Sequence, residues 1–350
     1  MIFIYIYVII IVKKFYLQRE VNMRVGIIGI GAIAQLHIPA LLNAEQDIVA
    51  LCDIKIDRCL KAIEKFGLKA KSYEDYNDMI EKEELDVVHV CTPHHLHAEM
   101  ICSALGRNVN VLCEKPIAIN YEQLDMIKAS VEKSSAQLGV CQQNRFKASM
   151  QYVKELFDGE EITAGSGYLC WQRDKNYYLS EDWRGQKETE GGGVVINQAL
   201  HTLDMLQWFC GMPRSVIAHT SCDTLNDIIN VEETAFAIFN LPNGGRFILN
   251  ATNSNTFSFP ITIMLHSKTK NVVIVDDNII YNGQFVTRSD GLPLFGKEVW
   301  GVGHIILIKE FYGALTDGRK FHLDFEEAQK VVKLLLALYE SEGKEITIRG

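Results

Sequence analysis

Two segments far apart in the sequence carry side chains that could act together on a hydroxyl group. The first is Cys113-Glu114-Lys115-Pro116, in which the lysine follows an apolar run where a buried strand should end. A lysine ammonium there can hydrogen-bond a reacting hydroxyl and lower the energy of the developing alkoxide. Pro116 biases Lys115 toward an extended backbone and so limits where the ammonium can go. A lone lysine at a strand end is more often a solvated surface charge. A role at a substrate hydroxyl depends on its place at the carboxyl end of a parallel strand, where ligands bind.

The second segment opens with Gly191-Gly192-Gly193 and continues into an apolar helical stretch. Asn197, His201 and Asp204 follow at spacings of four and three residues, so an α-helix would stack them on one face. Polar groups on a stripe of an apolar helix cost free energy unless they meet a ligand or each other. A single histidine there would more often be a satisfied core residue. Three aligned polar groups favour a substrate site.

A third segment could hold a dinucleotide. Residues 24–34 read RVGIIGIGAIA, a strand that runs into Gly29-x-Gly31-x-x-Ala34 and then into a helical stretch. The first glycine permits the tight turn, the second lets the backbone approach a pyrophosphate, and the small third residue allows close helix packing. A bare glycine motif is weak evidence, but strand, glycines and helix come here in the required order. Because N–H groups at a helix start face phosphates, we expect cofactor contacts at Gly29, Gly31, Ala32, Ile33 and Ala34.

Asp53 stands at the end of the second predicted strand, where a carboxylate can accept hydrogen bonds from the adenine ribose hydroxyls. This placement favours NAD over NADP. Lys55 and Arg58 lie close by in the sequence and leave a 2′-phosphate, hence NADP, open as a second option. The alternative for Asp53 is a solvated aspartate in a turn.

The elements that position these groups begin with alternating strands and helices between Arg24 and about Asn144. Strands are predicted at Val25–Ile28, Ile48–Leu51, Val87–Cys91, Val109–Cys113 and Gln137–Val140. Their hydrophobicity is continuous rather than alternating, which is typical of a parallel sheet covered by helices on both faces. We therefore predict an α/β fold whose residues 23–145 form a doubly wound, dinucleotide-binding Rossmann domain.

Residues 146–350 show a different pattern, with a helix near Ala148–Phe157 and another at about Val194–Cys210. Strands are predicted at Ile162–Trp171, Ser215–Ser221, Glu233–Asn240, Arg246–Ala251, Ile261–His266 and Asn271–Val275. The turn residues 242–245, Pro-Asn-Gly-Gly, favour a hairpin, and short turns imply antiparallel pairing. Closing helices are predicted at about Ile305–Thr316 and Phe325–Ser341, the latter capped by Asp324. We therefore expect a second α/β domain with a mostly antiparallel sheet.

Composition narrows the class of protein. A chain of 350 residues suits two domains. The net charge is −9 and no long run of Lys and Arg is present, which argues against a nucleic-acid partner. The nine cysteines form no Cys-x-x-Cys pair, so we expect a reducing cytoplasm rather than a disulfide framework or a structural zinc site.

The first 22 residues do not follow the same design. Met1–Val12 is entirely apolar, yet shorter than the roughly 20 residues that a membrane-spanning helix needs. Met23 directly precedes the first predicted strand. Our hypothesis is that residues 1–22 are an extension outside the fold and that no stable membrane insertion occurs. The alternative is a weak membrane anchor assisted by Lys13 and Lys14.

Taken together, the Gly-rich first turn, the Glu-Lys-Pro segment and the Gly-Gly-Gly…His-x-x-Asp helix resemble the Gfo/Idh/MocA family of oxidoreductases, which includes glucose–fructose oxidoreductase and inositol dehydrogenase. The resemblance spans about residues 23–345 and implies that the large second sheet often forms an oligomer interface. It implies a homo-dimer or homo-tetramer and a substrate that is a sugar, cyclitol, nucleotide sugar or related polyol. Lys115 would assist at the substrate hydroxyl, His201 would exchange its proton, and Asp204 would contact substrate or orient the site.

The resemblance also extends the expected cofactor and substrate contacts. Thr92, Pro93 and His97 resemble the family's Thr-Pro-x-x-x-His loop near the nicotinamide ribose, and Glu114 and Lys115 would join them at the cofactor. Many family members carry Asp four residues before the histidine, whereas this chain has Asn197. Asparagine cannot act as a base, so proton transfer would rest on His201, with Asn197 binding or orienting substrate.

The polar aromatic stretch Trp171–Arg184 supplies further candidates. Arg173, Trp183 and Arg184 offer aromatic faces and guanidinium donors that suit a polyhydroxylated ring, although such loops are also commonly structural. Metal binding by His94, His95 and His97 is the competing interpretation of the loop after the fourth strand. Because His94 and His95 are adjacent, they cannot easily share one ion, and we expect no metal site.

The activity expected from these residues is NAD(P)-dependent hydride transfer at a hydroxyl-bearing carbon. Two alternatives stay open at this point. One is a glycosidase that uses tightly held NAD for transient oxidation. The other is a non-catalytic sensor that binds a dinucleotide and a partner protein, against which the presence of both Lys115 and His201 argues.

Overall fold

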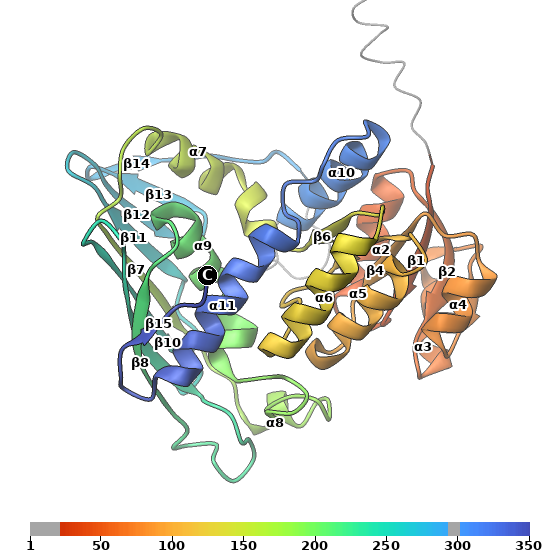
Figure 1. The fold of residues 1–350 in the computed structure, drawn as a ribbon, viewed down its shortest axis with the longest axis horizontal. Helices are drawn as coiled ribbons and strands as arrows, with labels where there is room; N and C mark the ends of the chain where they lie inside the picture. Colours follow the sequence, from red (N-terminus) through yellow and green to blue (C-terminus); the bar gives the residue numbers. More distant parts are fainter. Residues whose placement is uncertain (1–21, 293–301) are drawn as a thin grey trace, which may run out of the picture.

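Two sheets and their covering helices make up the computed structural model, which describes residues 22–292 and 302–350 (Figure 1). The predicted extension, residues 1–22, and the alternative of a membrane anchor fall outside the described residues except for Asn22. Among the helices that the structure describes, none is both long enough and apolar enough to span a membrane.

The first sheet has six strands in the order β3-β2-β1-β4-β5-β6, and every pairing is parallel. The strands are β1 Arg24–Ile28, β2 Asp47–Cys52, β3 Lys71–Tyr73, β4 Val87–Val90, β5 Asn110–Cys113 and β6 Leu138–Val140. All four residues of β4 are buried, as continuous hydrophobicity requires when helices cover both faces. The predicted doubly wound domain is confirmed, and β3 is an added edge strand too short and polar to predict.

The helices around this sheet begin and end at residues suited to those positions. They are α2 Ala34–Asn43, α3 Ile56–Phe66, α4 Tyr76–Lys82, α5 His97–Leu105 and α6 Tyr121–Lys133. Asp75 caps α4 by accepting from two backbone N–H groups, and Asn120 caps α6. Gly67 ends α3 at a φ of 64°, which glycine adopts without strain. Strand order reverses between β2-β1 and β4-β5, so a crevice for ligands is expected outside β1 and β4.

The second sheet has nine strands in the order β14-β13-β12-β11-β7-β10-β9-β8-β15. They are β7 Ala164–Cys170, β8 Ser215–Ser221, β9 Thr234–Asn240, β10 Arg246–Thr252, β11 Thr262–His266, β12 Asn271–Val275, β13 Asn278–Tyr281, β14 Gln284–Val286 and β15 Ile346–Thr347. The β7–β10 pair is parallel and the other pairs are antiparallel. The predicted hairpin joins β9 to β10, with Gly244 at a φ of 84°. The expected mostly antiparallel sheet is therefore confirmed.

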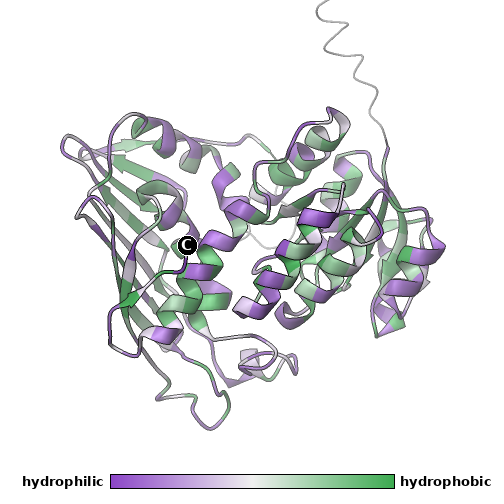
Figure 2. Ribbon diagram, in the orientation of Figure 1, coloured by the Kyte–Doolittle hydropathy of each residue, from purple (hydrophilic) through white to green (hydrophobic). Residues whose placement is uncertain are grey.

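Helices cover one face of this sheet and leave the other open. The remaining helices are α7 Ala148–Leu156, the short α8 Lys175–Tyr178, α9 Leu200–Cys210, α10 Gly303–Thr316 and α11 Phe325–Ser341. A Cβ on Gly167 of β7 would lie 2.6 Å from Thr202 and 2.9 Å from Leu206, so α9 packs directly on the strand backbone. Hydrophobic residues follow the strands of both sheets and the inner sides of these helices (Figure 2).

Helix α10 departs from the predicted domain division. Its residues Ile305, Ile308 and Phe311 belong to the same buried cluster as Ile27 of β1 and Ile38 of α2. We expected all residues after 145 to build the second domain. Instead, the apolar face of α10 is buried against the first domain, because Gly139 of β6 leaves room for the Phe311 ring that a Cβ would meet at 2.8 Å.

We predict that Phe311→Ala lowers the free energy of unfolding by about 3–5 kcal/mol, the usual cost of emptying a buried phenylalanine site. Phe311 is fully buried and packs edge-on against Phe321 at 5.2 Å between ring centroids. Urea denaturation followed by circular dichroism measures the change. Phe285→Ala is the control, since that ring is 82% exposed and should change stability by no more than about 0.5 kcal/mol. Equal effects of the two substitutions would show that α10 does not dock on the first domain.

Candidate active site

The glycine turn between β1 and α2 has the geometry of a phosphate-binding loop. Gly29 has a φ of 87°, and a Cβ there would lie 2.7 Å from the Cys91 carbonyl oxygen and 2.8 Å from the Thr92 side chain. Its position therefore requires glycine. A Cβ on Gly31 would meet no atom of the described residues within 4 Å, so the backbone there faces open space. That space and the start of α2 at Ala34 suit a pyrophosphate.

Asp53 is fixed beside this turn. Its Oδ2 accepts from the Ile30 N–H at 2.8 Å and its Oδ1 from the Lys55 N–H at 2.8 Å. Arg58 approaches the same carboxylate at 3.7 Å and also pairs with Glu181 of the second half at 3.1 Å. The carboxylate thus lies where the ribose of a dinucleotide on this turn would end, with a guanidinium next to it.

The loop after β4 is tied to the loop after β5 by His97. This imidazole is fully buried, with Nδ1 2.7 Å from the Pro116 carbonyl oxygen and Nε2 2.8 Å from the Thr92 carbonyl oxygen. Burial lowers its pKa, so the ring is neutral and donates from one nitrogen at a time. We expected His97 to contact the cofactor, but its ring nitrogens face backbone carbonyls. Thr92 and Pro93 remain half-exposed beside Gly29.

Lys115 is the second residue after β5, at the carboxyl edge of the first sheet, as predicted. Its ammonium donates to the backbone carbonyl of Asn197 at 2.9 Å. Burial lowers the pKa of Lys115, and the carboxylates of Glu114 and Glu190 oppose this effect. The lysine therefore reaches the helical segment that carries His201.

Glu114, which we expected to contact the cofactor, points into the protein interior. Its carboxylate is buried, and Oε1 accepts from His37 at 3.0 Å and from His304 at 3.1 Å. Burial favours the protonated form of Glu114, but the two imidazoles outweigh this effect and hold its pKa well below the usual range. The expected cofactor contact by Glu114 is thus replaced by interior hydrogen bonds, because neighbouring residues at a strand end point to opposite faces.

Four buried residues have the right atoms to hold a metal ion: His37, Glu114, Cys141 and His304, whose ligand atoms lie within 4.8 Å of one another. Both imidazoles already hydrogen-bond the same carboxylate oxygen, and the other ring nitrogen of His37 lies 2.8 Å from His89. Hydrogen bonding therefore accounts for the two histidines and the glutamate of this group. His94 and His95, considered earlier as metal ligands, face the backbone carbonyls of Glu190 and Thr189.

The helix that carries His201 is not one continuous α-helix. Residues Val195–Ala199 form a π-helical turn, and α9 begins only at Leu200. A π-turn changes the angle between successive side chains, so Asn197 is displaced from the stripe predicted with His201 and Asp204, which lie three residues apart in α9. The Asn197 side chain donates to Glu190, while its carbonyl accepts from Lys115.

His201 is half-buried one helical turn after Asn197, with Nε2 3.4 Å from the Gln143 amide nitrogen. Burial is the main cause that lowers the pKa of His201 well below its ordinary value, and the nearby positive charge of Lys115 lowers it further. A neutral imidazole can accept a proton, as a general base must. The Lys115 ammonium is close enough to His201 to act on its charge, and it contacts the helical turn that precedes this histidine.

Asp204 is committed to a buried ion pair. Its two carboxylate oxygens accept from Arg145 Nε at 3.0 Å and Nη2 at 2.6 Å, and both side chains are 3% exposed. Burial raises the pKa of Asp204, and Arg145 counteracts part of this change. Both oxygens already have donors, so of the two roles expected for Asp204 the structure fits orienting the helix and not a catalytic contact with substrate.

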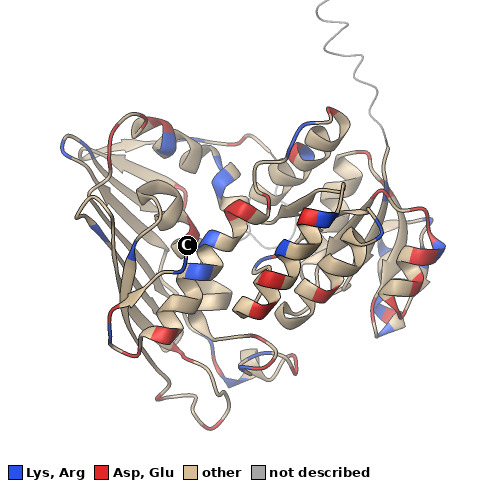
Figure 3. Cartoon of the chain, viewed as in Figure 1, with Lys and Arg blue, Asp and Glu red and all other residues tan. Residues whose placement is uncertain are grey.

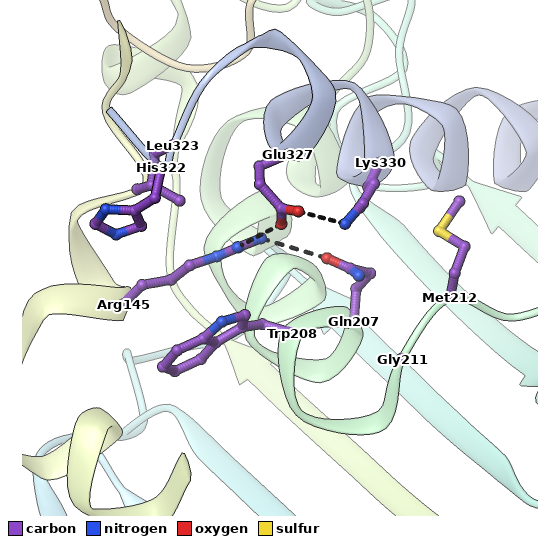
Figure 4. Close-up of a pocket in the computed structure, with 9 residues that line it drawn as sticks. All are labelled: Arg145, Gln207, Trp208, Gly211, Met212, His322, Leu323, Glu327 and Lys330. Atoms are coloured by element: carbon purple, nitrogen blue, oxygen red, sulfur yellow. Dashed lines mark hydrogen bonds and ion pairs between the residues drawn. The ribbon is translucent and has the colours of Figure 1, made fainter. Parts of the chain in front are cut away.

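A cavity of about 470 Å³ lies at this ion pair (Figure 4). It is lined by Arg145, Gln207, Trp208, Gly211, Met212, His322, Leu323, Glu327 and Lys330. The Arg145 side chain extends across it toward Glu327 and Gln207, which accept at 3.1 and 3.3 Å. Lys115, His201 and the predicted cofactor residues are not among its lining residues, and Arg145 joins it to Asp204.

The predicted substrate residues cluster around Tyr177. The Arg173 and Arg184 guanidinium groups lie 4.9 and 4.4 Å from the centre of its ring. Its hydroxyl accepts from Gln198 at 2.8 Å and lies 3.4 Å from the Asn197 amide. Trp183 packs against His94 of the first domain at 5.0 Å between centroids. The aromatic stretch is therefore continuous with Asn197.

Sequence reasoning missed three polar residues of this region. Gln143 and Arg145 follow β6 at the same sheet edge as Lys115, and this shared position was the signal that could have identified them. Glu190 precedes the three glycines and is 1% exposed. A charged residue in front of a glycine-rich opening carries no distinct signal, because most such residues are solvated.

Comparison with known proteins agrees with this geometry. Residues 23–142 match the model of an oxidoreductase family with an NAD-binding Rossmann fold, and residues 150–270 match the GFO/IDH/MocA C-terminal domain. Inositol 2-dehydrogenase of Salmonella paratyphi B is 26% identical over 190 residues, which are 53% of this chain and 54% of that protein. D-glucoside 3-dehydrogenase of Escherichia coli is 26% identical over 343 residues, covering 91% and 95%. The chain thus spans about half the length of the inositol dehydrogenase and nearly all of the glucoside dehydrogenase.

Among solved structures, the WlbA dehydrogenase from Bordetella pertussis in complex with NADH and UDP-GlcNAcA has the same fold. It superposes with a TM-score of 0.82 at 24% identity, covering 94% of this chain and 99% of that one. Both halves of the molecule match models of one family, and the glycine turn, the Glu-Lys-Pro segment and the histidine helix lie within them. The chain therefore belongs to the Gfo/Idh/MocA family of oxidoreductases.

Proposed function

We propose that the protein transfers hydride between a nicotinamide cofactor and a hydroxyl-bearing carbon of a sugar, cyclitol, nucleotide sugar or related polyol. The hydrogen bond between Lys115 and the Asn197 carbonyl carries the proposal, because it joins the cofactor domain to the helix of His201. The open backbone at Gly31 and the carboxylate of Asp53 fit a dinucleotide, with NAD preferred. When bound, the nicotinamide would supply the hydride acceptor or donor.

The residues of the chain would then manage the hydroxyl proton. In the oxidising direction, the neutral His201 imidazole accepts the proton while the Lys115 ammonium hydrogen-bonds the oxygen as negative charge develops. In the reducing direction the same imidazole returns the proton. Arg173, Trp183, Arg184 and the Asn197 amide would hold the remaining hydroxyl groups of the substrate.

The relatives support this substrate class. The names of the two similar proteins refer to oxidation of inositol and of a D-glucoside, and the WlbA structure holds NADH together with a nucleotide sugar. A levoglucosan dehydrogenase, crystallised with NADH and levoglucosan, has a TM-score of 0.81 with this chain at 23% identity. These names agree in placing the reaction at a hydroxyl carbon and disfavour the glycosidase and sensor alternatives.

A panel of sugars, inositols and nucleotide sugars tests the proposal directly. Purified protein is incubated with each compound and with NAD or NADP, and reduced cofactor is followed by absorbance. Net formation of NADH with at least one compound is expected. Free sugar released without net NADH would instead identify the glycosidase alternative, and dinucleotide binding without either reaction would identify a sensor.

The open face of the second sheet is the proposed contact between copies of the chain. Its outward residues include Tyr168, Phe236, Ile238, Ile248, Met264 and Val273, and the strands show few charged residues (Figure 3). An apolar sheet face of this extent favours a homo-dimer or homo-tetramer. Ile248→Lys in β10, next to the central strand β7, should convert the oligomer to monomers in analytical ultracentrifugation. A wild-type protein that sediments as a monomer would refute the interface.

We place the protein in the cytoplasm. All nine cysteines are free thiols, five of them buried, and a reducing compartment keeps them so.

We predict that His201→Ala lowers kcat by about 10²–10⁴-fold, the usual contribution of a positioned base. The affinity for NADH should change little, because the glycine turn and Asp53 are untouched. Steady-state kinetics and fluorescence titration with NADH measure the two effects. His322→Ala is the matched control, since that histidine is exposed between α10 and α11. Unchanged turnover in His201→Ala would remove this residue from the mechanism.

Asp53→Ala should weaken NAD binding about tenfold or more, because a hydrogen bond to a charged group is worth about 1.5–3 kcal/mol. NADP binding should weaken less, since its 2′-phosphate gains from removal of the carboxylate beside Arg58. Dissociation constants for both cofactors give the ratio. Asp53→Asn separates charge from structure, because the amide oxygen can still accept from a backbone N–H. An unchanged NAD-to-NADP ratio would place the ribose elsewhere.

A further inference from the structure

Glu190 is a buried carboxylate that the proposed mechanism does not use. It is 1% exposed and directly precedes the glycines that open the histidine helix. One oxygen, Oε2, accepts from the Gly185 N–H at 2.5 Å, and the other, Oε1, accepts from the Asn197 side-chain amide. Both carboxylate oxygens therefore face N–H donors, which suits the ionised form.

Asn197 lies between Glu190 and Lys115. Its side chain donates to the carboxylate, and its backbone carbonyl accepts from the lysine ammonium at 2.9 Å. A negative and a positive group are thus held on either side of one residue in the π-helical turn. Displacing the Asn197 side chain would also move the carbonyl that fixes the ammonium.

The backbone of Glu190 is joined to the cofactor domain as well. Its carbonyl oxygen accepts from His94 Nδ1 at 2.9 Å, and the His94 ring packs against Trp183. The residue therefore contacts the loop after β4 through its main chain and the histidine helix through its side chain. Its position is defined from both halves of the molecule.

The Glu190 carboxylate also acts on Lys115 through its charge, because few other carboxylates in the described part of the chain are available to the ammonium. Glu114 hydrogen-bonds two imidazoles in the interior, so part of its charge is already compensated. Among the described residues, the titratable and charged groups that act on Lys115 or Glu190 include Glu114, Arg184, Glu232, His94, His97, His201, His304, Tyr178 and Tyr339. Of these, Glu114 and Glu232 are the carboxylates, and Glu232 accepts from Gly193, Val195 and Tyr339 instead.

We propose that Glu190 is a positioning residue for Lys115: through Asn197 it fixes the ammonium, and its negative charge keeps that group protonated. The proposal rests on the function proposed above. Burial raises the pKa of Glu190 to about 7, so the carboxylate is predominantly ionised only above neutral pH. Burial lowers the pKa of Lys115, and the ionised Glu190 carboxylate opposes that loss of the lysine proton.

Substitution of Glu190 separates the two effects. Glu190→Gln removes the charge at nearly constant size, and the alkaline limb of the kcat/KM profile should move to lower pH by on the order of one unit. Glu190→Asp keeps the charge but has a shorter reach, so kcat should fall severalfold while the alkaline limb stays in place. The control is Glu233→Gln, a buried carboxylate that binds the backbone of residues 223–225 and should not move the limb. If Glu190 had only a structural role, Glu190→Gln would lower stability without moving the alkaline limb of the kcat/KM profile.

A double-mutant cycle tests the route through Asn197. In the Asn197→Ala background, Glu190→Asp should lower kcat by less than twofold, because the amide through which it acts is absent. An equal loss in both backgrounds would overturn the positioning role.

Titration of Lys115 by NMR keeps the test independent of turnover. Protein labelled with [ε-¹³C]lysine is titrated with and without Glu190→Gln, and Lys115 is assigned with Lys115→Arg. A lower titration midpoint of Lys115 in Glu190→Gln supports the positioning role of Glu190, whatever the substrate panel shows. Failure of every compound in the panel to be oxidised would contradict the proposed function instead. An unchanged midpoint refutes the electrostatic effect.

Discussion

One hydrogen bond joins the parts of this molecule that carry chemistry. The Lys115 ammonium, at the end of a parallel strand, donates to the Asn197 carbonyl at the start of the histidine helix. Lys115 and His201 come from different halves of the chain, so neither half alone assembles the pair. Burial makes the contact consequential, because a half-buried ammonium without an acceptor would be driven to lose its proton.

The residues behind this contact restrict it further. Glu114, adjacent to Lys115, is fixed by His37 of α2 and by His304 of α10, so the strand end cannot rotate freely. Against the lowering effect of burial, Cys91 and Glu114 raise the pKa of His37 to about 10, and the pair is ionic. On the other side, the buried Arg145–Asp204 pair fixes α9. Two interior ion pairs thus hold the backbone on which the reactive side chains stand.

Much of this arrangement was predictable, because it depends on patterns that the sequence displays. Continuous apolar runs identified the parallel strands, and the glycine turn and strand-end lysine followed from their order. The π-turn was not predictable, since Val195–Ala199 has the composition of an ordinary apolar helix. The ion pair of Asp204 with Arg145 was not predictable either, because the two residues lie far apart in the sequence. The interior contacts of Glu114 and His97 depend on residues distant in sequence, for which a single chain gives no signal.

The return of α10 to the first domain has a consequence for synthesis. The core around β1 and α2 includes Ile305, Phe311 and Phe321, residues made after strands β7 to β14 of the second sheet. As the chain leaves the ribosome, the apolar surface of the nucleotide-binding half that α10 covers therefore stays exposed until nearly all of the protein has been translated. Folding of this half is coupled to completion of the chain, so nascent fragments would be targets for chaperones.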